Sequence, residues 1–159
     1  MISIIIPIYN EAEIIQESLI QIKNQISSTP YVEEILVIDG GSSDDSLELA
    51  KKVSDIQVLS SPRGRPQQMN YGARQAKGEV LYFLHIDSYP PKNFDELIMN
   101  SIQTGHKAGC FKMKFRSQHP WLMFISWLTH FKARSCRGGD QSLFVTKELF
   151  QNIGGYNED

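Results

Sequence analysis

The sequence predicts an α/β fold in which helices cover both faces of a mostly parallel sheet. Short apolar runs alternate with segments whose apolar residues recur at helical spacing, and this alternation is typical of parallel sheets. The first run, residues 3–8, is almost continuously β-branched, as expected for a strand buried on both faces. No repeat, low-complexity tract or linker divides the 159 residues, so we expect a single domain, 1–159.

The first two thirds of the chain predict four strands, each followed by a helix. The expected strands span 3–8, 35–38, 56–59 and 80–84. The helices that follow them are expected at about 15–26, 45–53, 66–77 and 94–102. Asn10 and Glu13 form a capping-box pattern before the first helix, and Pro66 suits the first turn of the third. Alternation at 111–116 predicts an edge strand, and 143–146 predicts another strand before a short helix.

Composition limits the classes of function. A net charge of −2 provides no overall attraction to nucleic acid, so we expect no nucleic-acid partner. Cys110 and Cys136 lack the spacing of a metal or redox motif, and we expect two reduced cysteines in a cytoplasmic protein. Residues 1–8 have no basic flank, so we expect no signal peptide there.

One apolar stretch, residues 121–131, is followed by the basic residues Lys132, Arg134 and Arg137. It is shorter than the roughly 18 apolar residues that a membrane span needs. We favour a helix that packs on the sheet or in a homodimer interface. The alternative is an interfacial helix, in which 121–137 contacts anionic lipid at the inner face of the membrane.

Acidic residues follow three of the predicted strands. Glu11 comes shortly after the first strand, Asp39 directly after the second and Asp87 shortly after the fourth. Ligands bind at the carboxyl ends of parallel strands, so these acids predict one polar cleft that suits a metal ion. Mg²⁺ and Mn²⁺ prefer carboxylate oxygens, which makes Asp87 a candidate ligand. His85, on the same side of an extended chain, is either a second ligand or a hydrogen-bonded histidine.

Glycines and arginines near these acids suggest phosphate binding. In residues 40–43, Gly-Gly-Ser-Ser, the backbone N–H groups favour anions, although a tight turn capped by Asp39 is the simpler interpretation. Arg63 and Arg65 lie in a loop expected at the same sheet edge, where they either pair with phosphate or are merely solvated. Asp140 lies between Gly139 and Gln141 as a further acid candidate.

Six segments in order carry a resemblance to a known family. They are residues 4–11, 36–44, 63–70, 78–91, 139–141 and 154–156. Together they resemble family-2 inverting glycosyltransferases, which have the Rossmann-like GT-A fold. The Asp-Gly-Gly-Ser and His-x-Asp motifs, with Gly40 and His85 where the family commonly has acids, are similar to a bacterial subgroup.

The resemblance implies that these residues bind a nucleotide-diphosphate sugar. The residues placed at the nucleotide-sugar are Pro7, Tyr9, Glu11, Asp39, Gly41, Arg65, Gln68 and Asp87. Asp87, with His85, would hold a divalent cation, Mg²⁺ or Mn²⁺, that neutralises the departing diphosphate. We therefore expect transfer of a sugar to an unknown acceptor with inversion. The alternatives are a non-catalytic nucleotide-binding module and a nucleotidyltransferase on a similar sheet.

The family's catalytic base raises a question about the end of the chain. That base lies in a Glu-Asp motif some way beyond the Gly-Gly-aromatic turn, whereas here Glu158 and Asp159 follow Gly155 closely. We therefore expect the domain to be incomplete at its C-terminus and the usual base to be absent, which leaves Asp140 as the candidate base. The alternative is a complete short protein with Asp159 or Asp140 as base.

Overall fold

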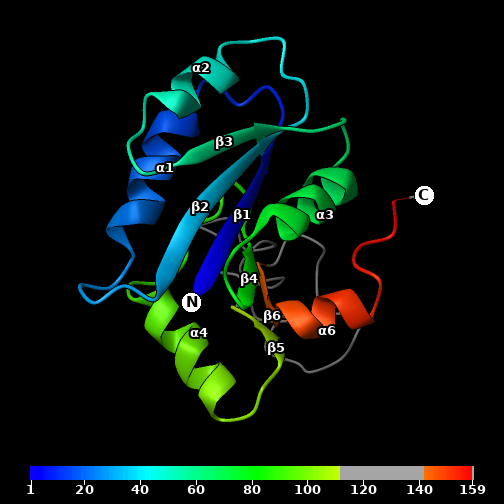
Figure 1. Ribbon diagram of the computed structural model, residues 1–159. Helices are drawn as coiled ribbons and strands as arrows, with labels where there is room; N and C mark the ends of the chain where they lie inside the picture. Colours follow the sequence, from blue (N-terminus) through cyan, green and yellow to red (C-terminus); the bar gives the residue numbers. More distant parts are fainter. Residues whose placement is uncertain (112–141, 159) are drawn as a thin grey trace, which may run out of the picture.

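The computed structural model describes residues 1–111 and 142–158, and these form one sheet flanked by helices (Figure 1). Within these residues the sheet has the strand order β3-β2-β1-β4-β6-β5. The strands are β1 (Ile2–Ile8), β2 (Val32–Asp39), β3 (Gln57–Ser60), β4 (Val80–Phe83), β5 (Ala108–Cys110) and β6 (Leu143–Thr146).

The pairing of β1 determines where the site can form. β1 runs parallel to both β2 and β4, and β2 runs parallel to β3. β6 is antiparallel to β4 and β5, so the sheet is mostly parallel, as predicted. Ile8 lies opposite Asp39, and Ile5 lies opposite Phe83. The C-terminal ends of β1 to β4 therefore lie side by side at the same end of the sheet. We call this end of the sheet the carboxyl rim.

Helices cover both faces of the sheet, as predicted from the alternation (Figure 1). The helices are α1 (Ile15–Asn24), α2 (Ser46–Lys51), α3 (Arg65–Gln75), α4 (Phe94–Gln103) and α6 (Lys147–Asn152). Residues of α1, α2 and α4 pack with Ile4 and Ile6 of β1 on one face. Residues of α3 and α6 pack with Ile5 on the other. A strand with a core on each side has apolar residues at successive positions, which explains the continuous run in β1.

The structure corrects two local expectations and adds one strand. β4 ends at Phe83, and a turn in which Ser88 N–H donates to the His85 carbonyl replaces the expected extended chain. Asn10 does not cap α1; its side-chain oxygen instead accepts a hydrogen bond from Ser43 N–H, and the N-cap residue is Ile14. The predicted edge strand at 111–116 lies outside the described residues apart from Phe111, and β5, at Ala108–Cys110, is a strand that we did not predict.

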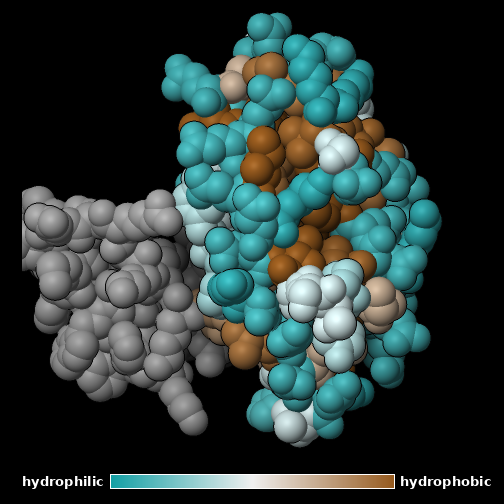
Figure 2. Space-filling view, turned by 90° about the vertical axis from the view of Figure 1, so that its left-hand side faces the viewer, coloured by the Kyte–Doolittle hydropathy of each residue, from teal (hydrophilic) through white to brown (hydrophobic). Residues whose placement is uncertain are grey.

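The surface on the α1 and α4 side exposes scattered apolar groups. Figure 2 views this side and shows hydrophobic side chains among hydrophilic ones. Ile20 of α1 and Leu97 of α4 are each about half exposed. No helix within 1–111 or 142–158 is long and apolar enough to cross a membrane. The segment 121–137, through which we expected contact with lipid or a second subunit, lies outside the described residues, as do Asp140 and Cys136.

Candidate active site

The three predicted acids all lie at the carboxyl rim. Asp39 is the last residue of β2 and is 3% exposed. Asp87 is exposed in the turn after β4. Glu11 follows β1, which lies between β2 and β4, so its loop lies between the other two acids. The strand-end pattern in the sequence thus correctly placed the three acids at one rim of the sheet, and among them Glu11 and Asp87 are close enough to interact electrostatically.

The carboxylate of Asp39 is bound by its own turn. It accepts hydrogen bonds from Gly41 N–H at 3.1 Å and from Ser42 N–H at 3.2 Å. The Ser42 hydroxyl donates to the same carboxylate at 2.5 Å. Gly41 has φ +81°, which favours glycine. The backbone N–H groups of Gly41 and Ser42, which we considered as phosphate ligands, therefore bind Asp39. The segment is a tight turn capped by Asp39, which was the simpler of the two interpretations.

The loop after β1 and the loop after β2 are joined by hydrogen bonds. Asn10 N–H donates to the Ser42 hydroxyl at 2.9 Å, and Ser43 N–H donates to the Asn10 side chain at 2.9 Å. Glu11 N–H donates to the Ser46 hydroxyl at 2.6 Å. We call these segments, 9–12 and 40–44, the rim loops. Their mutual hydrogen bonds fix Glu11 relative to Asp39.

Gln68 of α3 lies beneath the rim loops and is 4% exposed. Its side-chain nitrogen donates to the carbonyl of Ile8 at 2.8 Å and to that of Ile38 at 2.7 Å. The sequence resemblance placed Gln68 at the nucleotide-sugar. Since the amide nitrogen is bound to backbone, any such contact would have to use the amide oxygen.

The electrostatic character of the rim is negative around Glu11. Partial burial raises the pKa of Glu11, and the negative charges of Asp87 and Asp44 raise it further. The Ser46 hydroxyl, by contrast, hydrogen-bonds to Asp44 and lowers the pKa of that carboxyl. A cation bound near Asp87 would relieve the repulsion between these groups.

The arginines border the same region from the β3 side. The Arg63 guanidinium lies over the Tyr9 ring, 4.0 Å from its centroid, and so connects the loop after β3 with the first rim loop. Arg65 is the first residue of α3 and is exposed. Pro7, one residue before the end of β1, pairs with Ile38 in the sheet. Tyr9 and Arg63 thus form a mixed aromatic and cationic wall beside the acids.

The fit of a divalent cation rests on Asp87. Within 1–111 and 142–158, no group of three or more His, Cys, Asp or Glu residues could hold a metal ion. Mg²⁺ and Mn²⁺ commonly use one or two carboxylates together with water and substrate phosphates, so an exposed Asp87 with Glu11 nearby suits that mode. His85 is 7% exposed and lies at the other end of a turn, so the extended geometry from which we inferred a shared ligand pair is absent.

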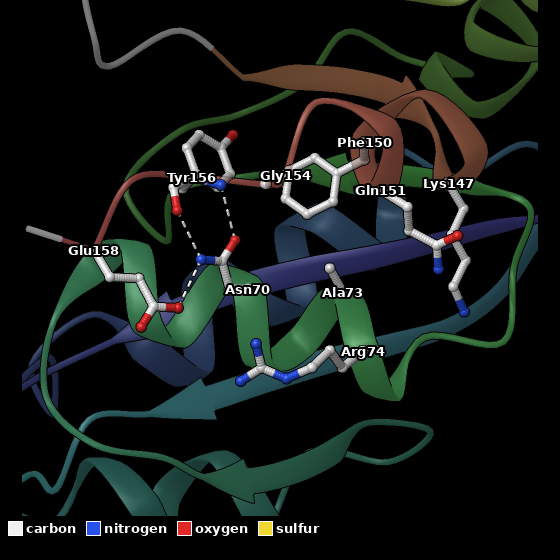
Figure 3. Close-up of a pocket in the computed structure, with 10 residues that line it drawn as sticks. Asn70, Ala73, Arg74, Lys147, Phe150, Gln151, Gly154, Tyr156 and Glu158 are labelled. Atoms are coloured by element: carbon white, nitrogen blue, oxygen red, sulfur yellow. Dashed lines mark hydrogen bonds between the residues drawn. The ribbon is translucent and has the colours of Figure 1, made fainter.

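Sequence reasoning missed a pocket of about 430 Å³ between α3 and α6 (Figure 3). We call it the α3–α6 pocket, and it is lined by Asn70, Ala73, Arg74, Lys147, Phe150, Gln151, Gly154, Gly155, Tyr156 and Glu158. None of the predicted nucleotide-sugar residues is among them. Asn70 binds both backbone groups of Tyr156 and donates to the Glu158 carboxylate at 2.7 Å. Glu158 is therefore held against α3.

Comparison with known proteins identifies the class that this fold and rim define. Residues 3–150 match the model of glycosyl transferase family 2, and the chain belongs to that family. The chain is 34% identical over 110 residues to glycosyltransferase AglE of Haloferax volcanii, a match that covers 64% of this chain and 35% of that protein. The chain thus spans about a third of that curated relative's length.

Solved structures confirm the GT-A fold. S. aureus TarS, residues 1–349, superposes with a TM-score of 0.75 at 22% identity, covering 99% of this chain and 50% of that one. Glucosyl-3-phosphoglycerate synthase from Mycobacterium tuberculosis, in complex with Mn²⁺, UDP and phosphoglyceric acid, superposes with a TM-score of 0.68 at 21% identity. That match covers 94% of this chain and 57% of the synthase.

Proposed function

We propose that the protein transfers a sugar from a nucleotide-diphosphate sugar to an acceptor, with inversion and with the assistance of a divalent cation. The observation that carries this proposal is the convergence of Asp39, Glu11 and Asp87 at the carboxyl rim of a family-2 domain. The synthase with a similar fold binds UDP and Mn²⁺, which supports a nucleoside diphosphate at this rim. Family membership favours glycosyl transfer over the nucleotidyltransferase alternative.

The residues at the rim have distinct parts in this proposal. Tyr9 and Arg63 border the space for the nucleoside, and Asp39 with Gly41 forms its floor. Arg65 contributes positive charge toward the diphosphate. A divalent cation, held by Asp87, would neutralise the negative charge that develops on the leaving diphosphate. Inversion requires a base that deprotonates the acceptor hydroxyl, and Asp140 remains our candidate.

Nucleotide binding tests the proposal directly. UDP or GDP with Mn²⁺, at about one hundred times its dissociation constant, stabilises a protein by about 2.7 kcal/mol, which is about 5 °C or more in melting temperature. We expect Asp39→Ala to abolish that rise and Asp87→Ala to abolish the part that depends on Mn²⁺. Glu79→Ala, an exposed acid at the opposite end of β4, should retain the full rise. Failure of every nucleoside diphosphate to raise the melting temperature of the wild type would refute the proposal.

Turnover separates an enzyme from a non-catalytic nucleotide-binding module, because both would show the thermal shift. The assay measures donor hydrolysis and sugar transfer by the full gene product. Release of nucleoside diphosphate from a UDP-sugar or GDP-sugar, lost in Asp87→Ala, is the expected result. Binding without any release would favour the binding module.

A further inference from the structure

The geometry points to Gln68 as a positioning residue for the nucleotide site, with Gly40 providing the room that its side chain needs. This inference rests on the proposed function, since it concerns the rim loops that would contact the nucleotide. Gln68 itself lies below those loops and would act through them.

The first observation is what the Gln68 amide joins. One nitrogen donates to Ile8 and Ile38, on two neighbouring strands, at 2.8 and 2.7 Å. The Ile8 carbonyl also accepts the Gly40 N–H at 3.0 Å. Each of these carbonyls lies just before a rim loop. A buried amide with both hydrogens bound this way fixes the spacing of the two strand ends.

The second observation concerns the space at Gly40. A Cβ built on Gly40 would lie 3.0 Å from both Cδ and Oε1 of Gln68. Gly40 does not have the positive φ that Gly41 has, so its backbone conformation does not require glycine. The constraint at position 40 is therefore one of space: a methyl group there would push by a few tenths of an ångström on an amide that two hydrogen bonds hold in place.

The third observation is that the rim loops are held from the opposite side as well. Asn10 and Ser42 join the loops above the strand ends, at 2.9 Å, while Gln68 joins the strands below. Asp39 directly follows Ile38, and Glu11 lies three residues after Ile8, so both acids are close in the chain to the carbonyls that Gln68 binds. Loss of these bonds leaves Asp39 paired within the sheet but removes the link by which α3 fixes the spacing of the two strand ends that carry the rim loops.

The first experiment removes the hydrogen bonds and keeps the volume. Gln68→Met retains a side chain of similar length without donors, and Gln75→Met is the control, an exposed glutamine on the same helix. The readouts are the dissociation constant of UDP or GDP with Mn²⁺ by calorimetry, and amide hydrogen exchange without nucleotide. We expect about tenfold weaker binding for Gln68→Met, faster exchange in 9–12 and 40–44, and no change for Gln75→Met.

The second experiment tests the role of Gly40 by a double-mutant cycle. Gly40→Ala in the wild type should weaken nucleotide binding about fivefold, because the methyl group displaces the amide. In the Gln68→Ala background the space is empty, so Gly40→Ala should change the dissociation constant less than about twofold. Equal effects in both backgrounds would overturn the pairing of Gly40 with Gln68.

The outcomes distinguish this inference from the proposed function. A wild type that binds no nucleoside diphosphate defeats the proposed function, and the positioning role for nucleotide falls with it. A wild type that binds, together with a folded Gln68→Met of unchanged affinity and unchanged loop exchange, overturns the positioning role alone. A loss of stability with unchanged affinity also overturns it, because Gln68 would then be merely structural.

Discussion

Glu11 shows how the carboxyl rim differs from an ordinary acidic surface. Partial burial raises its pKa, and the charges of Asp87 and Asp44 add to that effect. The rim therefore holds negative charges close enough to repel one another in the absence of a ligand. Such repulsion lowers the stability of the free protein, and a bound cation would remove it.

Substitution of Glu11 by glutamine should stabilise the protein without ligand. The pKa of Glu11 in the folded protein lies above the usual value of 4.5. The folded state therefore loses stability as the pH rises through that pKa and Glu11 becomes charged, and glutamine, which stays neutral, avoids this loss. At pH 7 we expect Glu11→Gln to raise the free energy of unfolding by up to about 0.5 kcal/mol, since partly exposed charges are screened. Urea unfolding at pH 7 and at pH 4 measures the difference.

The gain should vanish below pH 4.5, where Glu11 of the wild type is protonated. Glu79→Gln, an exposed acid away from the rim, is the control and should behave as the wild type at both pH values. A Glu11→Gln variant that is less stable than the wild type at pH 7 would contradict this account of the charges.

Sequence reasoning found the acids, but it did not predict the contacts that the Gln68 and Asn10 amides make at the rim. An acid directly after an apolar run leaves a recognisable pattern, because strand ends and rims follow from topology. The partners of Gln68 are backbone carbonyls, 60 and 30 positions away. Every residue has a backbone carbonyl, so the sequence does not indicate which carbonyls Gln68 binds. The same holds for Asn10, whose side chain binds Ser43 rather than its own helix.

At the scale of elements, α3 packs unusually closely on the sheet. Its residue Gly72 is buried, and a Cβ built there would lie 2.5 Å from Cγ2 of Ile5. It would also lie 3.2 Å from a side-chain carbon of Ile38. Glycine at this position lets the helix approach β1 and β2, which brings Gln68 within reach of the strand ends.

Gly72→Ala should therefore destabilise the protein although alanine favours helices. Helix propensity alone would predict an increase of about 1 kcal/mol in the free energy of unfolding. We expect instead a decrease of about 1–3 kcal/mol in that free energy, because the methyl group forces α3 away from Ile5. Chemical denaturation provides the measurement, with Gln75→Ala on the exposed side of α3 as control. A stabilised Gly72→Ala variant would show that the close packing of α3 is not required.

Element types were easier to predict than their ends. The alternation of strands and helices holds throughout the described residues, because apolar periodicity reflects burial. Leu84 is buried and apolar and was predicted as the last residue of its strand, yet β4 ends at Phe83 and a turn follows. β5, by contrast, is Ala-Gly-Cys, and its strand conformation comes from pairing with β6 rather than from its own sequence.

At the scale of the whole molecule, Asn70 connects parts of the chain that are 86 positions apart. Its side chain accepts from Tyr156 N–H and donates to the Tyr156 carbonyl, each at 2.9 Å. A Cβ on Gly155 would lie 2.7 Å from the Asn70 side-chain oxygen, so glycine permits this approach. Burial raises the pKa of Tyr156 to about 12. The turn after α6 is thus held against the helix that also supports the rim.

Loss of the Asn70 side chain should release this turn. Asn70→Ala leaves backbone groups of Tyr156 without partners, so we expect a loss of about 1–3 kcal/mol in the free energy of unfolding. Amide exchange should accelerate in residues 154–158 and remain unchanged in α1. Asn100→Ala, on the exposed side of α4, serves as the control. Unchanged exchange at Tyr156 would show that other contacts hold the turn.

The central place of β1 has a consequence for how the chain acquires its structure during synthesis. β1 can pair with β2 once residue 39 has left the ribosome, but its other edge waits for β4, which begins at Val80. Until β4 has been synthesised, the backbone groups on that edge of β1 have no strand to pair with. Such delayed, non-local pairing slows folding and exposes the nascent protein to aggregation. Chaperone dependence and low yield at high expression rates are the practical result that we anticipate.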